Sequence, residues 1–338
     1  MQDYASRSKI RNIFNSLNKI FKKSHMKFNK LKLLDFLAFS IALIILLPIF
    51  NFFKEAIVIV YRGEFNLGLT GKSEIIGTIK ILLFTSLISG TLGIINGWLL
   101  SNCDFRFRKF LRICQLIPLA APAYLITAIL QDLASILGYQ LTGIGWGTII
   151  LSISTYPYVF ILTNESFNKF GVNQINASRS LGVGPWKSFF RIALPMALPA
   201  LATGISLSCM EVMNELGTFE LLNIPSISTG ITESWNVDGN PTGAIGLSLF
   251  ALLIVFTLII LEKSSRKRTK RWSESPSNST SQGWKLNNFR SLFAIMISTF
   301  PALFSIGIPI IWVLFNIDQL QKGLTSELFI LTLRTVML

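Results

Sequence analysis

The sequence predicts an all-α polytopic membrane protein, and three observations support this fold class. Hydrophobic residues make up 51% of the 338 residues and charged residues only 14%, with a mean hydropathy of +0.55. Long uncharged stretches recur along the chain, and the segments between them alternate between rich and poor in basic residues. Because an average soluble domain is about 25% charged, this composition excludes a water-soluble globular protein.

Seven stretches approach the length of about 20 apolar residues that a helix needs to cross a bilayer. Six contain no charged residue, and the other is interrupted only by Lys80. The predicted spans are 36–53, 75–100, 113–131, 143–163, 192–210, 241–261 and 291–317. The basic leader before the first span is 35 residues long and no small-residue cleavage site follows the span. We therefore expect this span to remain as a helix and not to be a cleaved signal peptide.

The leader, residues 1–35, carries nine Lys and Arg residues. Its apolar residues Ile10, Phe14, Leu17 and Phe21 recur at helical spacing. A basic amphipathic helix is typical of binding to an anionic membrane surface, so membrane lipid is the expected partner. A calmodulin-like or nucleic-acid site is the weaker alternative, and we expect no nucleic-acid partner.

Basic residues between the spans predict the orientation of the chain. Cytoplasmic segments retain more Lys and Arg than outward-facing segments. The leader and the segments 101–112, 164–191 and 262–290 together hold 25 of these residues, whereas the alternate segments hold 4. The amino terminus is therefore predicted to be cytoplasmic. Lys80 and Arg334 lie near the outer ends of their spans, where long side chains can reach the headgroups.

A short internal repeat predicts two halves. Thr78-Ile79-Lys80 and Thr332-Leu333-Arg334 each stand at the outer start of a span. We expect a first membrane domain of six spans over 36–262, a cytoplasmic linker over 263–290, and the start of a second repeat over 291–338. The last apolar run, 329–338, reaches roughly half-way across a bilayer at about 1.5 Å per residue. We therefore expect the natural chain to continue beyond this point.

Residues that could carry metal or nucleotide chemistry are few. The cysteines at 103, 114 and 209 and the histidine at 25 are scattered, so neither a disulfide framework nor a Cys/His metal site is indicated. We expect no cofactor and no tightly bound metal. Gly71-Lys72-Ser73 resembles the end of a phosphate-binding loop, but that loop needs a glycine where Asn66 stands. Any ATP hydrolysis would therefore take place on another polypeptide.

The segment 164–199 contains the strongest local pattern. We expect a short helix from Asn176 to Leu181, a turn at Gly182 and Gly184, and a second short helix that opens with proline at its first position. The second helix carries three aromatic residues, Trp186, Phe189 and Phe190. On a loop that faces water, these rings need something to pack against. They either cover the helix ends of the same chain or contact a partner.

The spacing of this segment resembles the EAA loop of permease subunits of ABC importers. The pattern is E-A-A, a glycine four positions later, nine further residues, and I-x-L-P. The matching residues are Asn176, Ala177, Ser178, Gly182, Ile192, Leu194 and Pro195. The spacing is intact, and the departures are asparagine for the acid and serine for the second alanine. The resemblance implies the helical bundle of a type I ABC importer, with a coupling loop that docks on a separate ATPase subunit. Pro185 and Trp186 belong to that coupling loop.

Two further groups of residues resemble the ferric-iron branch of these permeases. They are 118–124 with 156–159, and 210–220 with 229–231 and Trp235. That branch fuses two permease halves in one chain. The resemblance implies ferric iron import across the bacterial inner membrane, with ABC ATPase subunits and an extracytoplasmic substrate-binding protein as partners. Permeases that import thiamine, polyamines or phosphonates share much of this scaffold and are the alternatives.

Acidic residues inside a span mark a candidate translocation pathway. Glu211 and Glu215 are four residues apart on one helix face, with Asn214 beside them. A carboxylate at the bilayer centre costs about 2.5–3.5 kcal/mol on insertion scales, so such groups usually face a bundle interior or a wet cavity. Tyr156 and Tyr158 are the other candidate pathway residues. Hydrogen bonds that only hold neighbouring helices together are the alternative role.

These features predict transport by alternating access. Partner ATPases would push on the loop around Gly182, and the two halves would rock about the membrane midplane to release substrate inside. Since a permease must release its substrate, weak and sparse oxygen ligands are expected for a ferric ion. Two alternatives come from other classes: a membrane-embedded enzyme with Glu211 and Glu215 as acid and base, and a structural anchor. The intact spacing of the loop disfavours both.

Overall fold

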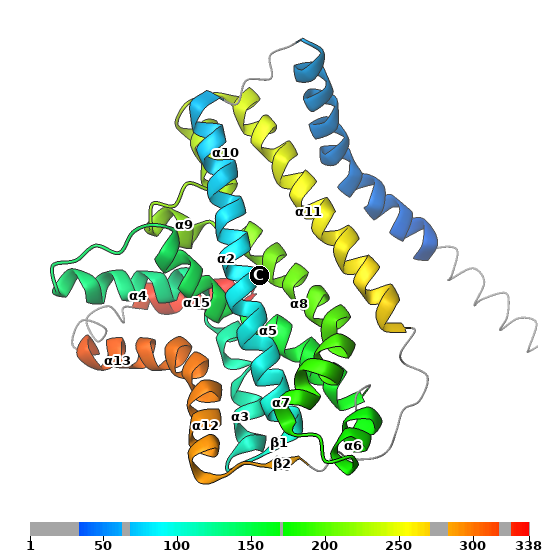
Figure 1. The fold of residues 1–338 in the computed structure, drawn as a ribbon. Coiled ribbons are helices and arrows are strands. Elements are labelled where there is room, and N and C mark those ends of the chain that lie inside the picture. Colours follow the sequence, from blue (N-terminus) through cyan, green and yellow to red (C-terminus); the bar gives the residue numbers. More distant parts are fainter. Residues whose placement is uncertain (1–33, 63–67, 170–171, 271–282, 318–325, 338) are drawn as a thin grey trace, which may run out of the picture. The chain divides into compact units, whose positions relative to one another are not determined.

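The computed structural model describes residues 34–62, 68–169, 172–270, 283–317 and 326–337 (Figure 1). The chain divides into two units, residues 1–65 and 66–338. In the first unit, the described part is one apolar helix, Leu34–Tyr61. It confirms the first predicted span. The predicted amphipathic leader falls almost wholly outside the described residues.

The second unit is built from helices. Its principal elements are α2 (Gly68–Asn102), α3 (Arg108–Cys114), η1 (Ile117–Ala120), α4 (Ala123–Ile136), α5 (Ile144–Lys169), α6 (Val172–Ser180), α7 (Pro185–Ser188), η2 (Phe189–Ala193), α8 (Leu194–Asn214), α9 (Gly217–Leu221), α10 (Ile227–Asn236) and α11 (Pro241–Lys270). The chain continues through α12 (Asn288–Ala302), η3 (Leu303–Gly307), α13 (Ile308–Phe315) and α15 (Ser326–Met337). Counting Leu34–Tyr61 of the first unit, six described helices are long and apolar enough to cross a membrane, or seven if one bent pair is a single span.

Small residues allow α2, α5 and α8 to pack closely at the centre of this unit. A Cβ atom added to Gly93 of α2 would lie 2.5 Å from the Cβ of Val159 on α5, and one added to Gly204 of α8 would lie 2.6 Å from the Cα of the same valine. Such close approach of helix backbones is typical of membrane bundles, where dispersion and interhelical hydrogen bonds replace the hydrophobic effect.

A chain of buried hydroxyls joins the same three helices. The Oγ atoms of Ser89 on α2 and Ser208 on α8 lie 3.3 Å apart, and Ser208 donates to Thr155 Oγ1 on α5 at 2.7 Å. All three side chains are buried. These bonds satisfy polar groups that would otherwise be unpaired in an apolar interior.

The predicted span 113–131 is not one straight helix. Arg108–Ala120 and Ala123–Ile136 meet at 83°. Pro122 is the N-cap residue of α4, and Ala121 before it is extended with ψ 105°. A residue before proline is disfavoured in the helical region, so the helix breaks there. The prediction of an uninterrupted span was therefore wrong in shape, although the apolar stretch itself was located correctly.

Two π-helical turns precede prolines. Pro195 follows η2 by two residues, and Pro309 follows η3 by two residues. Proline has no N–H and its ring clashes with the carbonyl four residues earlier. A π turn widens the helix at the point of that clash. Figure 1 shows that α12 and α13, which flank η3, run in clearly different directions.

The described chain resumes at residue 283, beside the end of α2. Trp284 and Lys285 form a short parallel strand, β2, that pairs with β1 (Cys103–Asp104). This pairing lies at the same end of the unit as α6 and α7, which we call the loop end, and α9 and α10 lie at the opposite end (Figure 1). Helix α11 continues to Lys270, so it includes the first residues of the predicted linker 263–290.

Candidate functional site: the loop of α6 and α7 and the pocket beside α8

The turn after α6 is closed by its own backbone. Gly182 has φ +72°, and its N–H donates to the carbonyl of Arg179 at 2.9 Å while the N–H of Val183 donates to that of Ser178 at 3.0 Å. This is a Schellman motif, in which a glycine takes the left-handed conformation that other residues adopt only at a cost. The predicted turn is present, and α6 spans Val172–Ser180 where a helix from Asn176 to Leu181 was expected.

A buried hydroxyl pair joins the two short helices of the loop. The Oγ atoms of Ser178 on α6 and Ser188 on α7 lie 2.8 Å apart, and both side chains are buried. Ser178 Oγ also lies 2.8 Å from the carbonyl of Ile175, to which it donates. Because this uses its only proton, the proton between the two hydroxyls comes from Ser188. The serine that departs from the EAA pattern therefore has a structural role in the loop.

The three aromatic residues of the loop separate into two groups. Phe189 is only 5% exposed and packs on Trp98 of α2, with ring centroids 5.3 Å apart. Trp186 and Phe190 are 62% and 60% exposed and stack on each other. The first alternative from the sequence therefore holds for Phe189, which covers the chain's own helix ends, and the two exposed rings remain available to a partner.

The remaining residues of the EAA-type pattern lie on the same loop as these aromatic residues or at the start of α8. Asn176 is half-buried and Ala177 is exposed on α6. Ile192 and Leu194 are half-buried, and Leu194 packs beside the buried cluster that contains Trp98 and Phe189. The exposed Pro195 begins α8 together with Leu194, and Pro185 begins α7.

The sequence did not predict that Trp284, near the end of the linker, packs against Arg179 of α6. The Trp284 ring lies 5.5 Å from the Trp98 ring, and the guanidinium of Arg179 lies over it at 5.1 Å. The N–H of Leu286 donates to the carbonyl of Asp104 at 3.1 Å, which adds to the strand pairing. A lone tryptophan after a polar linker was the only signal, and nothing local in the sequence connects it with position 179.

The predicted pathway residues are brought together only in part. A pocket of about 200 Å³ beside α8 is lined by Tyr158, Glu211 and Glu215 among others. Tyr158 Oη lies 3.5 Å from Glu211 Oε2. Asn214 is exposed and does not line this pocket. Tyr156 is buried elsewhere, where its Oη donates to Gln115 Oε1 at 3.0 Å.

The remainder of the pocket wall comes from the broken span and from α5. Its lining residues there are Pro118, Leu119, Ala121, Pro122, Ala123, Tyr124, Leu151, Ser154 and Thr155. The bend at Ala121 therefore forms one side of the pocket. Glu215 also makes two hydrogen bonds to a nearby residue: its Oε1 accepts from the Thr218 N–H at 3.0 Å and from the Thr218 hydroxyl at 2.7 Å. Glu211 is left as the less constrained carboxylate.

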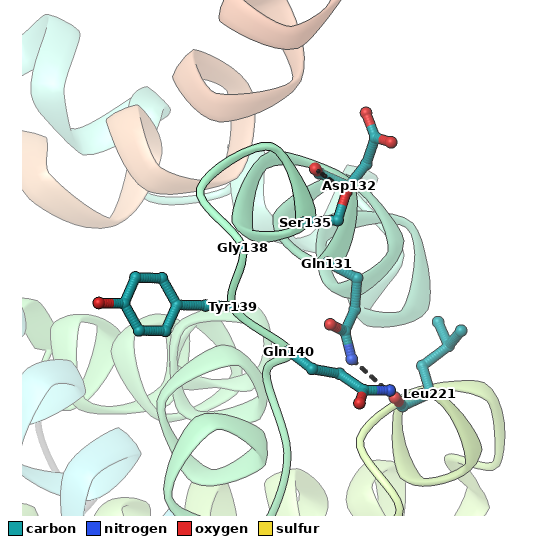
Figure 2. A pocket seen from close by; sticks show the side chains of 7 residues that line it. All are labelled: Gln131, Asp132, Ser135, Gly138, Tyr139, Gln140 and Leu221. Carbon is teal, nitrogen blue, oxygen red and sulfur yellow. Dashed lines mark hydrogen bonds between the residues drawn. The ribbon is translucent and has the colours of Figure 1, made fainter.

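A larger, open hollow of about 660 Å³ lies at the end of α4 (Figure 2). Gln131 reaches from α4 to the next loop and to α9: its Nε2 donates to the carbonyls of Leu141 at 2.6 Å and Leu221 at 2.8 Å. Asp132 points the other way, and its Oδ2 accepts from Trp312 Nε1 at 2.6 Å. These bonds tie α4 to α9 and α13, so we assign this hollow a structural role.

Comparison with known protein families identifies the chain's class. Residues 89–270 match the family described as "Binding-protein-dependent transport system inner membrane component", which is more than half of the chain. The chain belongs to this family. The matched region contains the loop of α6 and α7 and the pocket beside α8. An inner-membrane, multi-pass protein is therefore established.

The curated relatives of this chain are named for the transport of different substrates. The Fe(3+)-transport system permease protein FbpB 2 of Haemophilus influenzae is 23% identical over 252 residues, 70% of this chain and 46% of that protein. The molybdenum transport system permease protein ModB of Escherichia coli K12 is 27% identical over 217 residues, 57% of this chain and 94% of ModB. The probable sulfate transport system permease protein cysT of Chlorella vulgaris is 25% identical over 161 residues, 44% of this chain and 60% of that protein.

The chain thus spans about half the length of the ferric-iron relative. Among solved structures, a bacterial ABC transporter involved in the import of the acidic polysaccharide alginate matches with a TM-score of 0.46 and 15% identity. That match covers 60% of this chain and 81% of the other.

Proposed function

We propose that this chain is a permease subunit of an ATP-driven ABC importer and that the loop of α6 and α7 receives force from a separate ATPase. The observation that carries the proposal is a group of three exposed apolar residues on this loop, which we call the apolar patch. Trp186 and Phe190 are 62% and 60% exposed and stack on each other, and Leu181 before the turn is 82% exposed. Exposed apolar groups that gather on one surface mark an interaction site. Tryptophan and other aromatic residues are also enriched at the centres of protein interfaces.

The charge pattern supports a cytoplasmic position for this patch. The loop end carries Arg106, Arg108, Lys109 and Arg112 before and within α3, and four more basic residues in 164–191. Lys and Arg are retained on the cytoplasmic side, where ATP is available. In this orientation the loop faces an ATPase and the α9–α10 end faces an extracytoplasmic substrate-binding protein.

The loop is suited to transmit a push because it is fixed to the bundle. The Schellman turn and the hydroxyl pair hold α6 against α7, and Phe189 anchors α7 to Trp98 of α2. Helix α8 then runs from Leu194 to Asn214 without a break. Glu211 lies 21 residues beyond Phe190, or roughly 30 Å at about 1.5 Å per residue. One continuous helical segment, Pro185–Asn214, therefore connects the patch with the acidic pocket, which is the connection that alternating access requires.

We propose ferric iron as the substrate on the charge of the pocket beside α8. Two carboxylates, Glu211 and Glu215, and the Tyr158 hydroxyl line it, and no described lysine or arginine does. Carboxylate and phenol oxygens suit a hard cation, whereas an oxyanion such as sulfate or molybdate would be repelled. Thiamine and polyamines are cations and are the alternative substrates. The same charge disfavours phosphonates.

The coupling proposal is tested by association with the ATPase. We expect Trp186→Ala and Phe190→Ala in the full-length protein to lower both ATPase co-purification and substrate uptake. Phe289→Ala is the matched control, because Phe289 is 82% exposed at the start of α12 and lies outside the loop. Unchanged co-purification and uptake in the loop variants would contradict the proposal and favour the structural anchor.

The substrate proposal is tested by uptake into vesicles that contain the full transporter and its substrate-binding protein. We expect uptake of ferric iron and none of sulfate or molybdate, and a loss of iron uptake in Glu211→Gln. Uptake of thiamine or a polyamine in place of iron would overturn the assignment to iron. Uptake of an oxyanion would overturn the inference from the pocket's charge.

A further inference from the structure

A second acidic hollow lies at the α9–α10 end, away from the pocket beside α8. Its volume is about 500 Å³. It is lined by Ser73, Glu74, Phe219, Glu220, Asn223, Ile224, Pro225, Thr229, Thr232, Glu233, Asn236 and Val237. These residues come from the start of α2, from α9 and from α10 with its flanking turns. The start of α2 and α10 lie at the end of the unit opposite the loop (Figure 1).

The charge of this hollow is unbalanced. Three carboxylates, from Glu74, Glu220 and Glu233, line it, and no lysine or arginine among the described residues does. Glu74 is 6% exposed, and its Oε2 is buried without a hydrogen-bond partner. Buried polar atoms are nearly always hydrogen-bonded, so an unpartnered oxygen in a carboxylate that lines a hollow indicates a missing donor to that carboxylate. The sequence pattern that drew attention to Gly71-Lys72-Ser73 ends one residue before this carboxylate.

Glu74 cannot move away from this position easily, because α10 covers it. Its carboxylate packs directly on Gly230, where there is no room for a Cβ atom. Helix α10 is held in turn by a capping box between Ser226 and Thr229, and the N–H of Ile227 donates to Thr78 Oγ1 at 2.8 Å. The contacts with α10 therefore hold Glu74 in place at the wall of the hollow.

The walls of the hollow favour a basic side chain over a bare metal ion. No group of three or more His, Cys, Asp and Glu residues that could hold a metal is found in the part of the chain that the structure describes. Phe219, Ile224 and Val237 make part of the lining apolar. The stem of an arginine or lysine packs on apolar surface while its head reaches a carboxylate. A hydrated metal ion makes no use of apolar walls.

We propose that this hollow receives an arginine or lysine side chain of the extracytoplasmic substrate-binding protein, whose head pairs with Glu74 and Glu233. The proposal rests on the importer function proposed above. It places the contact at the end that this function assigns to the outside. Val237 lines the hollow and is exposed, so it can cover the pair from water, as surrounding contacts do at the centres of protein interfaces.

The test measures binding of the purified substrate-binding protein to the full-length transporter in nanodiscs. We expect Glu74→Gln and Glu233→Gln each to raise the Kd about tenfold or more, because each removes one partner of a charge pair at an interface. Asp104→Asn is the matched control: it removes one exposed carboxylate at the loop end and leaves the Kd unchanged. Thermal unfolding of each variant separates a loss of binding from a loss of fold.

Four outcomes would overturn the proposal. Both glutamine variants could bind the substrate-binding protein as the unchanged transporter does, with the importer function intact. The effect could vanish in EDTA, which would indicate a divalent cation, or appear only with phosphatidylethanolamine in the nanodisc, which would indicate a lipid ammonium group. If the unchanged transporter does not bind the substrate-binding protein at all, the importer function fails together with this proposal.

Discussion

At the scale of single residues, the loop of α6 and α7 depends on a few positions whose chemistry admits few substitutes. Gly182 is required for its backbone conformation, with φ +72°. Ser178 is required for a hydroxyl that reaches Ser188. The spacing of the pattern predicts the first requirement from the sequence, because a glycine between two short helices indicates a turn. The second depends on two side chains ten residues apart meeting across the turn, which no local pattern shows.

Gly182 and Gly184 form a matched pair for testing the turn. An added Cβ atom would meet nothing within 4 Å at either position, but Gly184 has an ordinary φ of −67°. We expect Gly182→Ala to lower the free energy of unfolding by roughly 1–2 kcal/mol, because the left-handed conformation is costly for alanine. Gly184→Ala should have a smaller effect. Thermal unfolding and substrate uptake measure both, and equal effects at the two positions would contradict this account of the turn.

The hydroxyl pair is tested by a double-mutant cycle. We expect Ser178→Ala to destabilise the protein by about 1–3 kcal/mol, since it leaves the buried Ser188 hydroxyl unpaired. Ser188→Ala should cost less, because Ser178 keeps its hydrogen bond to the Ile175 carbonyl. The double variant removes both polar groups and should lose less than the sum of the two single losses. Denaturation of the purified transporter gives the three values. Strictly additive losses would show that the two hydroxyls do not interact.

At the scale of elements, apolar length predicts the spans well and says little about their shape. The predicted spans 75–100, 143–163, 192–210, 241–261 and 291–317 each coincide with a long described helix, with at most two residues outside it. The bend between η1 and α4 was missed because Ala121 and Pro122 are apolar and do not interrupt a hydrophobic run. The packing of Trp284 between Trp98 and Arg179 was missed because it joins segments that are far apart in the chain.

Close packing of α2 on α5 gives a test at this scale. A Cβ atom at Gly93 would lie 2.5 Å from the Cβ and 2.6 Å from the Cγ1 of Val159, and 2.9 Å from the backbone N of Phe160. We expect Gly93→Ala to destabilise the bundle by about 1–3 kcal/mol, because the helices must separate. Gly145→Ala on α5, where an added Cβ meets nothing within 4 Å, is the control. Thermal unfolding with no difference between the two would contradict the observed packing.

At the scale of the whole molecule, single helices join the two ends of the second unit and connect the loop with the candidate pathway. Helix α8 begins at the loop and ends beside the acidic pocket, and α2 connects Trp98 at the loop end with Glu74 at the other. The sequence predicted the pathway carboxylates from their cost in a membrane. It could not predict which of them is less constrained, because Thr218 donates hydrogen bonds to Glu215 only once α9 has folded beside it.

Orientation of the chain in the membrane is tested by cysteine labelling. Ser180 in the loop and Gln140 between α4 and α5 are both exposed, so a cysteine at either site reacts readily with a charged maleimide. The native cysteines are buried. Burial also raises the pKa of the Cys103 thiol from 9.0 to about 11, which lowers its thiolate fraction at pH 7 about a hundredfold. The background reaction is therefore small.

We expect Ser180→Cys to be labelled in inside-out vesicles and not in intact cells, because the basic segments around the loop hold it on the cytoplasmic side. Gln140→Cys should show the reverse. The two sites control for each other, since each reports reagent access from one side. Labelling of Ser180→Cys from outside intact cells would place the apolar patch of Leu181, Trp186 and Phe190 away from ATP. A soluble ATPase could then not reach the patch, and the coupling mechanism would fail even though the chain belongs to a transport family.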